Sequence, residues 1–98
     1  MDNLSNYRNK RILDGARGAP CMHCTIEDGT IVAAHSNQYR DGRGMHLRSH
    51  DFRVAYLCGV CHDHVDKEGR VTKAERTEVW EAAHRATIEY MFLKGIVK

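Results

Sequence analysis

The stretch Leu57-Cys58-Gly59-Val60-Cys61-His62 decides the fold of this 98-residue chain, because it places two cysteines at the spacing of a metal-binding knuckle. An earlier pair, Cys21 and Cys24, has the same spacing. Two such pairs together offer four thiolates, the ligand set of a tetrahedral structural zinc site. We therefore predict that Cys21, Cys24, Cys58 and Cys61 bind one Zn²⁺ and clamp two distant parts of the chain together.

A bound zinc ion also suits the length of the chain. A domain of this size buries only about two thirds of the surface that its unfolded chain exposes, so a further source of stability is expected. A structural zinc ion contributes about 10 to 16 kcal/mol in small finger peptides, which exceeds the net stability of many domains. We expect one domain over 1–98, made of a basic N-terminal helix or arm (1–18), a zinc-knuckle core (19–68) and a C-terminal helix (72–95).

Other roles for the cysteines stay open on sequence alone. The chain begins without an apolar signal core, and no run approaches the roughly 20 apolar residues of a membrane span. We therefore expect a cytoplasmic protein, and there CxxC pairs bind metal more often than they form disulfides. Iron ligation and thiol redox chemistry are alternatives. The run 58–62 also matches the c-type haem attachment motif, but that role requires export and leaves the first cysteine pair unused.

Two elements are predicted before the second knuckle. A helix is expected from Ser5 to about Ala16, with Ser5 as its N-cap. Residues 25–34 predict a β-hairpin, because Asp28-Gly29 is a strong two-residue turn signal and strand-forming residues follow it. This hairpin would place His35 at the end of its second strand.

The C-terminal segment carries the clearest helix signals. Thr72 and Glu75 fit a capping box, and Gly95 fits a helix stop. Apolar residues between them recur at intervals of three and four, as on the buried face of an amphipathic helix. These residues are Val79, Ala83, Ala86, Tyr90 and Leu93, with Trp80, Thr87 and Met91 beside them. The hairpin and this helix together predict a small zinc-stapled α+β domain.

The residues after the first knuckle suggest hydrolytic chemistry. A short helix is expected from Val60 to about Lys67, on which His62 and Asp66 are four residues apart and share a face. An imidazole and a carboxylate there could hold Mg²⁺, Mn²⁺ or a second Zn²⁺ with positions left for water and phosphate. His35 could take a proton from the attacking water. The competing interpretation is structural, with His35 in a strand-end hydrogen bond and the helix pair merely solvated.

Charge gives weaker information about partners. The formal net charge is only +2. The segment 36–53 predicts a polar loop, through which four arginines are spaced, and a basic face there could contact phosphates. These arginines are Arg40, Arg43, Arg48 and Arg53. A solvated surface of mixed charge is an equally good interpretation of the counts.

Three stretches carry a resemblance to a known family. They are Ile31 to Asn37, then Gly42 to Met45, then Leu57 to His62 with Asp66 beyond it. In this order they resemble the HNH endonucleases of the ββα-metal (His-Me finger) class. The similarity is greatest to the small phage and prophage YbcO-like nucleases, and extends to the nuclease domain of the phage Ref protein, which acts with the RecA recombinase. It covers roughly residues 15 to 95.

The resemblance implies a ββα-metal fold with one catalytic metal, in which His35 is the general base and His62 a metal ligand. It also implies cleavage of DNA during phage recombination or processing in the cytoplasm of a bacterial host, with a RecA-type recombinase as a candidate partner. Two positions depart from the family pattern. Ala34 stands where many members have an aspartate ligand, and the middle asparagine is missing, with Arg53 near its place and Asp51 or His50 as substitutes. The alternative function is a non-catalytic zinc module that binds DNA or protein.

Overall fold

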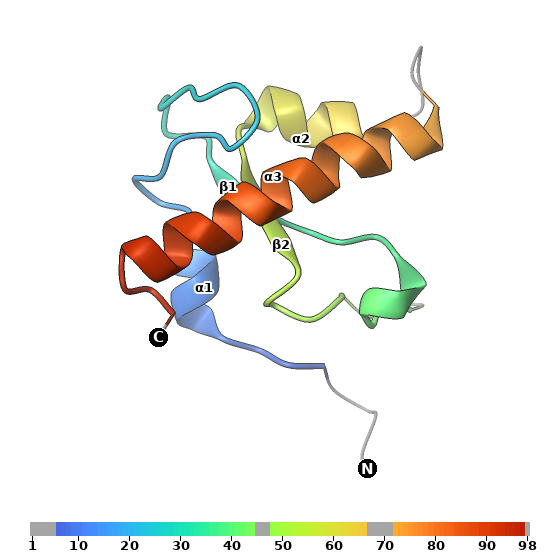
Figure 1. Ribbon diagram of the computed structural model, residues 1–98, viewed down its shortest axis with the longest axis horizontal. Helices are drawn as coiled ribbons and strands as arrows, with labels where there is room; N and C mark the ends of the chain where they lie inside the picture. Colours follow the sequence, from blue (N-terminus) through green and yellow to red (C-terminus); the bar gives the residue numbers. More distant parts are fainter. Residues whose placement is uncertain (1–5, 45–47, 67–71, 98) are drawn as a thin grey trace.

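The computed structural model describes residues 6–44, 48–66 and 72–97. The described residues form an α+β fold, in which a pair of antiparallel strands packs against a long C-terminal helix (Figure 1). The predicted fold class is therefore confirmed. The elements in chain order are α1 (Lys10–Asp14), β1 (Val32–His35), a 3-10 turn (Tyr39–Asp41), β2 (Val54–Leu57), α2 (Gly59–Asp66) and α3 (Lys73–Leu93).

The sheet pairs β1 with β2, and the loop 36–53 connects them. Val32 lies opposite Leu57 at one end of the pair, and His35 lies opposite Val54 at the other. All four residues of β2 are buried, because α3 crosses this strand (Figure 1). His35 therefore sits where β1 opens into the long loop, as predicted for a strand-end histidine.

The hairpin predicted over residues 25–34 is wrong, because its second strand pairs with β2 instead. The Asp28 carboxylate accepts hydrogen bonds from the backbone N–H and the hydroxyl of Thr30, at 2.9 and 2.6 Å. These bonds close a local turn that needs no strand partner. Upstream, the backbone N–H of Cys21 donates to the carbonyl of Ile26 (2.8 Å), which ties that segment into the first knuckle.

The helix α3 has both predicted ends. The hydroxyl of Thr72 accepts from the backbone N–H of Glu75 (3.1 Å), and the Glu75 carboxylate accepts from the N–H of Thr72 (3.4 Å). After the last turn, Gly95 has a φ of +73° and the N–H of Ile96 donates to the carbonyl of Met91 (2.9 Å), which is a Schellman motif. The helix end signals in the sequence were sufficient here.

The buried face of α3 is rotated slightly from the predicted one. Its buried residues are Trp80, Ala83, His84, Thr87 and Met91, whereas Leu93 is 77% exposed. Three of these side chains hydrogen-bond to the strand backbones at 2.7 to 3.0 Å. The pairs are Trp80 with the Ala34 carbonyl, His84 with the Val54 carbonyl, and Thr87 with the Tyr56 N–H. Polar side chains of α3 thus satisfy backbone groups that the two-stranded sheet leaves unpaired.

The N-terminal helix is shorter than predicted. It starts at the N-cap Asn9, whose side chain accepts from the N–H of Arg11 (3.0 Å), and Ser5 lies outside the described residues. Residues 6–9 are not helical, because their backbone is bonded to the loop before β2. The helix α2 spans 59–66, close to the prediction, and Lys67 lies outside the described part. None of the helices among the described residues combines the length and the apolar character that a membrane-spanning helix needs.

Candidate functional site

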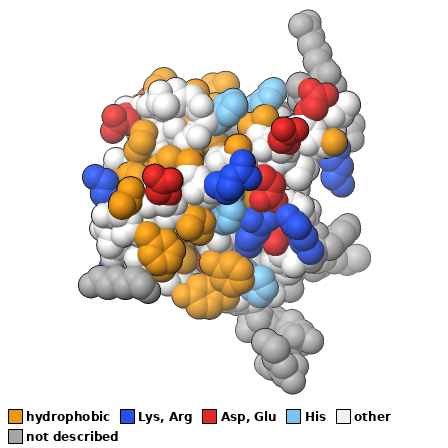
Figure 2. All heavy atoms as spheres, viewed as in Figure 1, with side chains coloured by type: hydrophobic (Ala, Val, Ile, Leu, Met, Phe, Trp, Pro, Cys, Tyr) orange, Lys and Arg blue, Asp and Glu red, His pale blue; other side chains and the backbone are white. Residues whose placement is uncertain are grey.

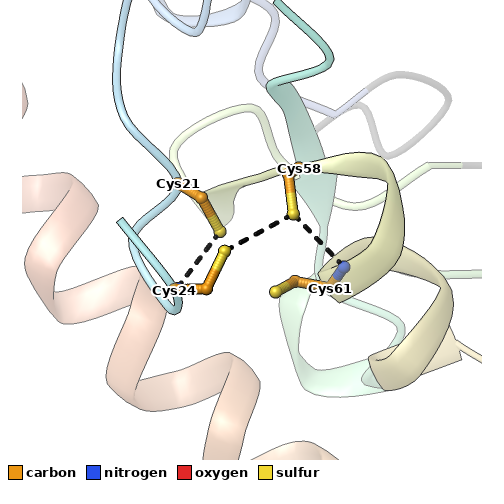
Figure 3. Close-up of side chains that lie close together, drawn as sticks. All are labelled: Cys21, Cys24, Cys58 and Cys61. Atoms are coloured by element: carbon orange, nitrogen blue, oxygen red, sulfur yellow. Dashed lines mark hydrogen bonds between the residues drawn. The ribbon is translucent and has the colours of Figure 1, made fainter. Parts of the chain in front are cut away.

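The four cysteines come together in one cluster, as predicted (Figure 3). Their sulfur atoms all lie within 4.8 Å of one another, and Cys24 Sγ is 3.7 Å from Cys58 Sγ. A tetrahedral site with Zn–S bonds of about 2.3 Å has sulfur atoms about 3.8 Å apart, so the spacing suits a zinc ion. All four are free thiols, with three buried and Cys24 exposed. The cluster can hold a structural Zn²⁺.

Both knuckles have local geometry that points donors at sulfur. Backbone N–H groups of His23 and Cys24 donate to Cys21 Sγ at 3.4 and 3.5 Å, and the N–H of Cys61 donates to Cys58 Sγ at 3.5 Å. Such donors stabilise thiolate charge. Burial by itself would raise the pKa of the Cys21 thiol, but these and other hydrogen bonds lower the pKa to about 6. Burial and the neighbouring sulfurs raise the pKa of Cys61.

His35 is paired with a buried carboxylate. Its Nε2 lies 2.8 Å from Oδ1 of Asp51, whose side chain is only 1% exposed. The sequence suggested Asp51 only as a substitute for the missing asparagine. In the structure Asp51 is the hydrogen-bond partner of His35. An ionised carboxylate can only accept a hydrogen bond, so Nε2 of His35 is the donor and Nδ1 is the ring nitrogen left to accept a proton.

The N-terminal segment holds Asp51 in place. Arg8 Nη1 donates to Oδ1 of Asp51 (3.0 Å), and the backbone N–H of Asn9 donates to Oδ2 (2.7 Å). The backbone N–H of Asp51 donates in turn to the carbonyl of Tyr7 (3.0 Å). Burial would raise the pKa of Asp51, but the hydrogen bonds from His35, Asn9 and Arg8 lower it below its ordinary value. Asp51 is therefore a carboxylate at neutral pH.

A pocket brings His35 together with Asp66. The pocket lies between the end of β1, the end of α2 and the first turns of α3. Its lining residues are His35, Asn37, Gln38, Val65, Asp66, Lys73, Arg76, Thr77 and Trp80. His62 does not line it, although its Nε2 lies 3.3 Å from Oδ2 of Asp66. The helix pair predicted from the four-residue spacing is thus formed, with both side chains substantially exposed.

The described part of the chain contains no second group of three or more side chains that could hold a metal ion. There the four cysteines are the only group of three or more His, Cys, Asp or Glu side chains close enough to hold an ion. His62 and Asp66 offer two ligands, and Ala34, at the position where many HNH enzymes have an aspartate, is buried. A catalytic metal at this helix pair stays a prediction.

The four loop arginines have different environments. Arg40, Arg43 and Arg48 are exposed. Arg53 is largely buried, and its guanidinium donates to Glu81 (2.6 and 3.1 Å) and Asp41 (3.0 Å) and covers the Trp80 ring at 4.9 Å. Figure 2 shows basic and acidic side chains next to one another on the face that carries α3. The contacts of Arg53, and an ion pair of Arg40 with Glu81 (2.9 Å), join the loop to α3. Arg43 and Arg48 leave charge at the surface.

The Glu81 carboxylate should make stability depend on pH. The hydrogen bond from Arg53, against the effect of burial, lowers the pKa of Glu81 from 4.5 to about 2, with help from Gln38 and Arg40. Because the folded pKa is lower, this stabilisation is complete above about pH 4.5 and is lost as the pH falls towards 2. Glu81→Gln should cost about 1 to 3 kcal/mol at neutral pH. This loss in the free energy of unfolding should become smaller as the pH falls, because the wild-type carboxylate is then protonated too.

Urea unfolding of the wild type and Glu81→Gln measures this difference, from neutral pH down to the lowest pH at which both proteins keep their zinc. Acid releases zinc from thiolates, and the loss of zinc is expected to unfold both proteins. Zinc content is therefore measured at each pH, so that the difference between the two proteins isolates the carboxylate. Glu89→Gln, at an exposed position of the same helix, is the matched control and should track the wild type at every pH. A deficit that stays constant as the pH falls would contradict the assignment.

Local sequence patterns do not specify the positions of His84 and of residues 6–9. His84 is buried and stacks on Trp80 with ring centroids 5.2 Å apart, so it belongs to the core. Residues 6–9 reach the site across more than 30 positions of sequence, and no local pattern signals such contacts.

Comparison with protein family models, with curated proteins and with solved structures finds no match to this chain. The assignment of function therefore depends on the site itself and on the motif resemblance.

Proposed function

We propose that this protein is a metal-dependent endonuclease of the HNH type that hydrolyses DNA phosphodiester bonds. The observation that carries the proposal is the His35–Asp51 pair at a pocket that Asp66 of α2 also lines. The elements follow one another as β1, β2 and α2, with His35 on the first and the His62–Asp66 pair on the last. This is the order that the resemblance to ββα-metal nucleases implies.

His35 is the general base of the proposed reaction. With its Nε2–H fixed on Asp51, Nδ1 is the nitrogen that accepts a proton from the attacking water. The carboxylate also stabilises the imidazolium that forms in this step. The buried position of Asp51 keeps bulk water from competing for the hydrogen bond.

His62 and Asp66 are the proposed ligands of the catalytic metal, which would be Mg²⁺, Mn²⁺ or a second Zn²⁺. Two protein ligands leave most coordination positions to water and to the phosphate, as hard cations at phosphoryl sites prefer. The bound ion would stabilise charge on the phosphate and on the leaving oxygen. Asp66 connects the two halves of the proposal, because it contacts His62 and also lines the pocket of His35.

Basic residues around the pocket would attract the DNA backbone. Lys73 and Arg76, on the first turn of α3, line the pocket. Arg40, Arg43 and Arg48 are exposed on the loop between the strands and supply further phosphate contacts. Arg53 is used inside the protein, so its predicted contact with DNA is no part of this proposal. A role in phage recombination with a RecA-type recombinase, in the bacterial cytoplasm, follows from the resemblance alone.

Plasmid cleavage tests the proposal. Zinc-loaded protein with Mg²⁺ or Mn²⁺ should convert supercoiled DNA to nicked or linear forms. The variant His35→Ala should lose this activity while it keeps its fold and its zinc. His64→Ala, an exposed histidine on α2, is the matched control and should cut like the wild type. Equal cutting by His35→Ala would remove the general base from the proposal.

A non-catalytic zinc module that binds DNA or protein is the second candidate. It is favoured by one observation, that the described residues supply only the cysteine group as a metal site of three or more ligands. This function predicts DNA binding that His35→Ala leaves intact, with no cleavage by any variant in any divalent metal. The plasmid assay and a binding assay on the same preparations separate the two candidates.

A further inference from the structure

Three aromatic side chains form an exposed cluster around the backbone of Asp51, whose carboxylate contacts His35. We define this aromatic cluster as Tyr7, His50 and Phe52. The His50 and Phe52 rings are stacked, with centroids 4.8 Å apart and planes within 8°, and the Tyr7 ring is tilted against Phe52 at 5.6 Å. Tyr7 is 48% exposed and Phe52 46%. Figure 2 shows hydrophobic side chains beside a histidine below α3. Large aromatic rings gathered at a surface often mark a binding site.

Three hydrogen bonds hold the aromatic cluster in place. The N–H of Tyr7 donates to Nδ1 of His50 (3.0 Å), and the Tyr7 hydroxyl accepts from Nδ2 of Asn9 (2.9 Å). The N–H of Asp51, between the two ring-bearing loop residues, donates to the carbonyl of Tyr7 (3.0 Å). These contacts fix the rings although they are not part of the hydrophobic core. The side chains therefore lose little conformational entropy when a ligand stacks on them.

An exposed arginine lies near the aromatic cluster in sequence. Arg48 is exposed and lies two residues before His50. The Arg48 carbonyl accepts from Nη2 of Arg8 (2.8 Å), but the charge of Arg8 is paired with Asp51 (3.0 Å), so Arg48 is the arginine available to a phosphate. Aromatic rings next to arginines are the combination that nucleic-acid-binding proteins use to stack a base and neutralise its phosphate.

Asp51 connects the aromatic cluster with the proposed general base. Its carboxylate holds His35, and its chain neighbours are His50 and Phe52. None of the three rings lines the pocket of His35, so a strand that enters this pocket would reach the cluster by continuing past Asp51. Only an unpaired base can present its face to these rings, because the bases of a duplex are covered by their stacked neighbours.

We propose that the aromatic cluster is a stacking platform for an unpaired base, so that single-stranded or locally unpaired DNA is the preferred substrate. The inference depends on the proposed nuclease function and adds a substrate class to it. Stacking on an aromatic side chain tolerates every base, since each has a π face, so the platform selects unpaired structure and not sequence.

Binding to a fluorescein-labelled oligothymidylate, with no Mg²⁺ or Mn²⁺ added, tests the platform by fluorescence anisotropy. Phe52→Ala should weaken this binding about 5- to 150-fold, the range that loss of one stacked base gives. Phe92→Ala is the matched control, because Phe92 is also exposed (56%) but lies near the end of α3. Phe52→Trp should retain affinity, and its indole fluorescence should be quenched when the oligonucleotide binds. Circular dichroism and zinc content verify the fold of each variant.

The outcomes separate this inference from the proposed function. If the wild type cuts plasmid and Phe52→Ala binds the single strand as tightly as Phe92→Ala, the platform is wrong and the nuclease stands. If Phe52→Trp binds without quenching, the base does not stack there and the platform is also wrong. If the wild type binds neither single nor double strands, both proposals fail. If Phe52→Ala instead abolishes a concentration-dependent dimer in sedimentation and leaves DNA binding unchanged, the cluster is a protein interface.

Discussion

Removal of the metal from the four-cysteine cluster is expected to unfold this protein. The cluster joins the loop of Cys21 and Cys24 to the end of β2 and the start of α2 (Figure 3). Zinc binding to such a site contributes about 10 to 16 kcal/mol, as much as the whole net stability of a typical small domain. Incubation with a strong chelator should abolish the helical circular dichroism signal, and Cys61→Ala should be unfolded as expressed. One zinc per chain should be released when the thiols are titrated with a mercurial.

The matched control for the cysteine substitution is His23→Ala. His23 lies inside the first knuckle and is exposed, so its loss should change neither zinc content nor the unfolding midpoint. Four thiols should become reactive only after chelation, which separates zinc binding from disulfides and from a redox CxxC. An apo protein that keeps its helical signal and melts cooperatively would show that the hydrophobic core suffices without zinc. The absence of a Soret band in the purified protein would exclude haem.

Local signals predicted the parts of the fold that local chemistry controls. The spacing of the two cysteine pairs was enough to predict the cluster, because the knuckle is a local structure that a metal completes. The capping box at Thr72 and the stop at Gly95 were enough to place α3, because helix ends are satisfied by residues within one turn. The cysteine cluster and the two ends of α3 are therefore predictable from nearby residues alone.

Long-range contacts decided the rest and were not predictable. Asp28-Gly29 is a good hairpin signal, yet β1 pairs with a strand beyond the loop, and nothing near Asp28 specifies that partner. In the candidate site, sequence spacing brought His62 to Asp66 but could not show that Asp66 shares a pocket with His35. The burial of Asp51, and its contacts to Arg8 and His35, likewise depend on how separate segments pack.

Loss of the Asp51 carboxylate is expected to reduce DNA cleavage about as strongly as loss of His35, by roughly 10²- to 10⁴-fold. In Asp51→Asn, the side chain loses its negative charge and one of its two acceptor oxygens. It therefore no longer stabilises the imidazolium that forms when His35 takes the proton from water. Long-range ¹H–¹⁵N NMR spectra should show the proton of the neutral ring on Nε2 in the wild type. Plasmid cleavage rates measure the consequence.

Stability must be separated from catalysis in this experiment, because Asp51 also anchors the N-terminal segment. Arg8→Ala supplies the control, since it removes one anchor of Asp51 and leaves the His35–Asp51 hydrogen bond. Both variants should lose stability of about 1 to 3 kcal/mol, because each leaves a buried polar group with fewer partners. Only Asp51→Asn should lose most of the activity. If Arg8→Ala loses as much activity at equal stability, or if Asp51→Asn cuts normally while His35→Ala does not, the carboxylate does not orient the base. Asp51 is then an anchor for the N-terminal segment alone, because the hydrogen bonds from Arg8 and Asn9 would remain its one demonstrated use.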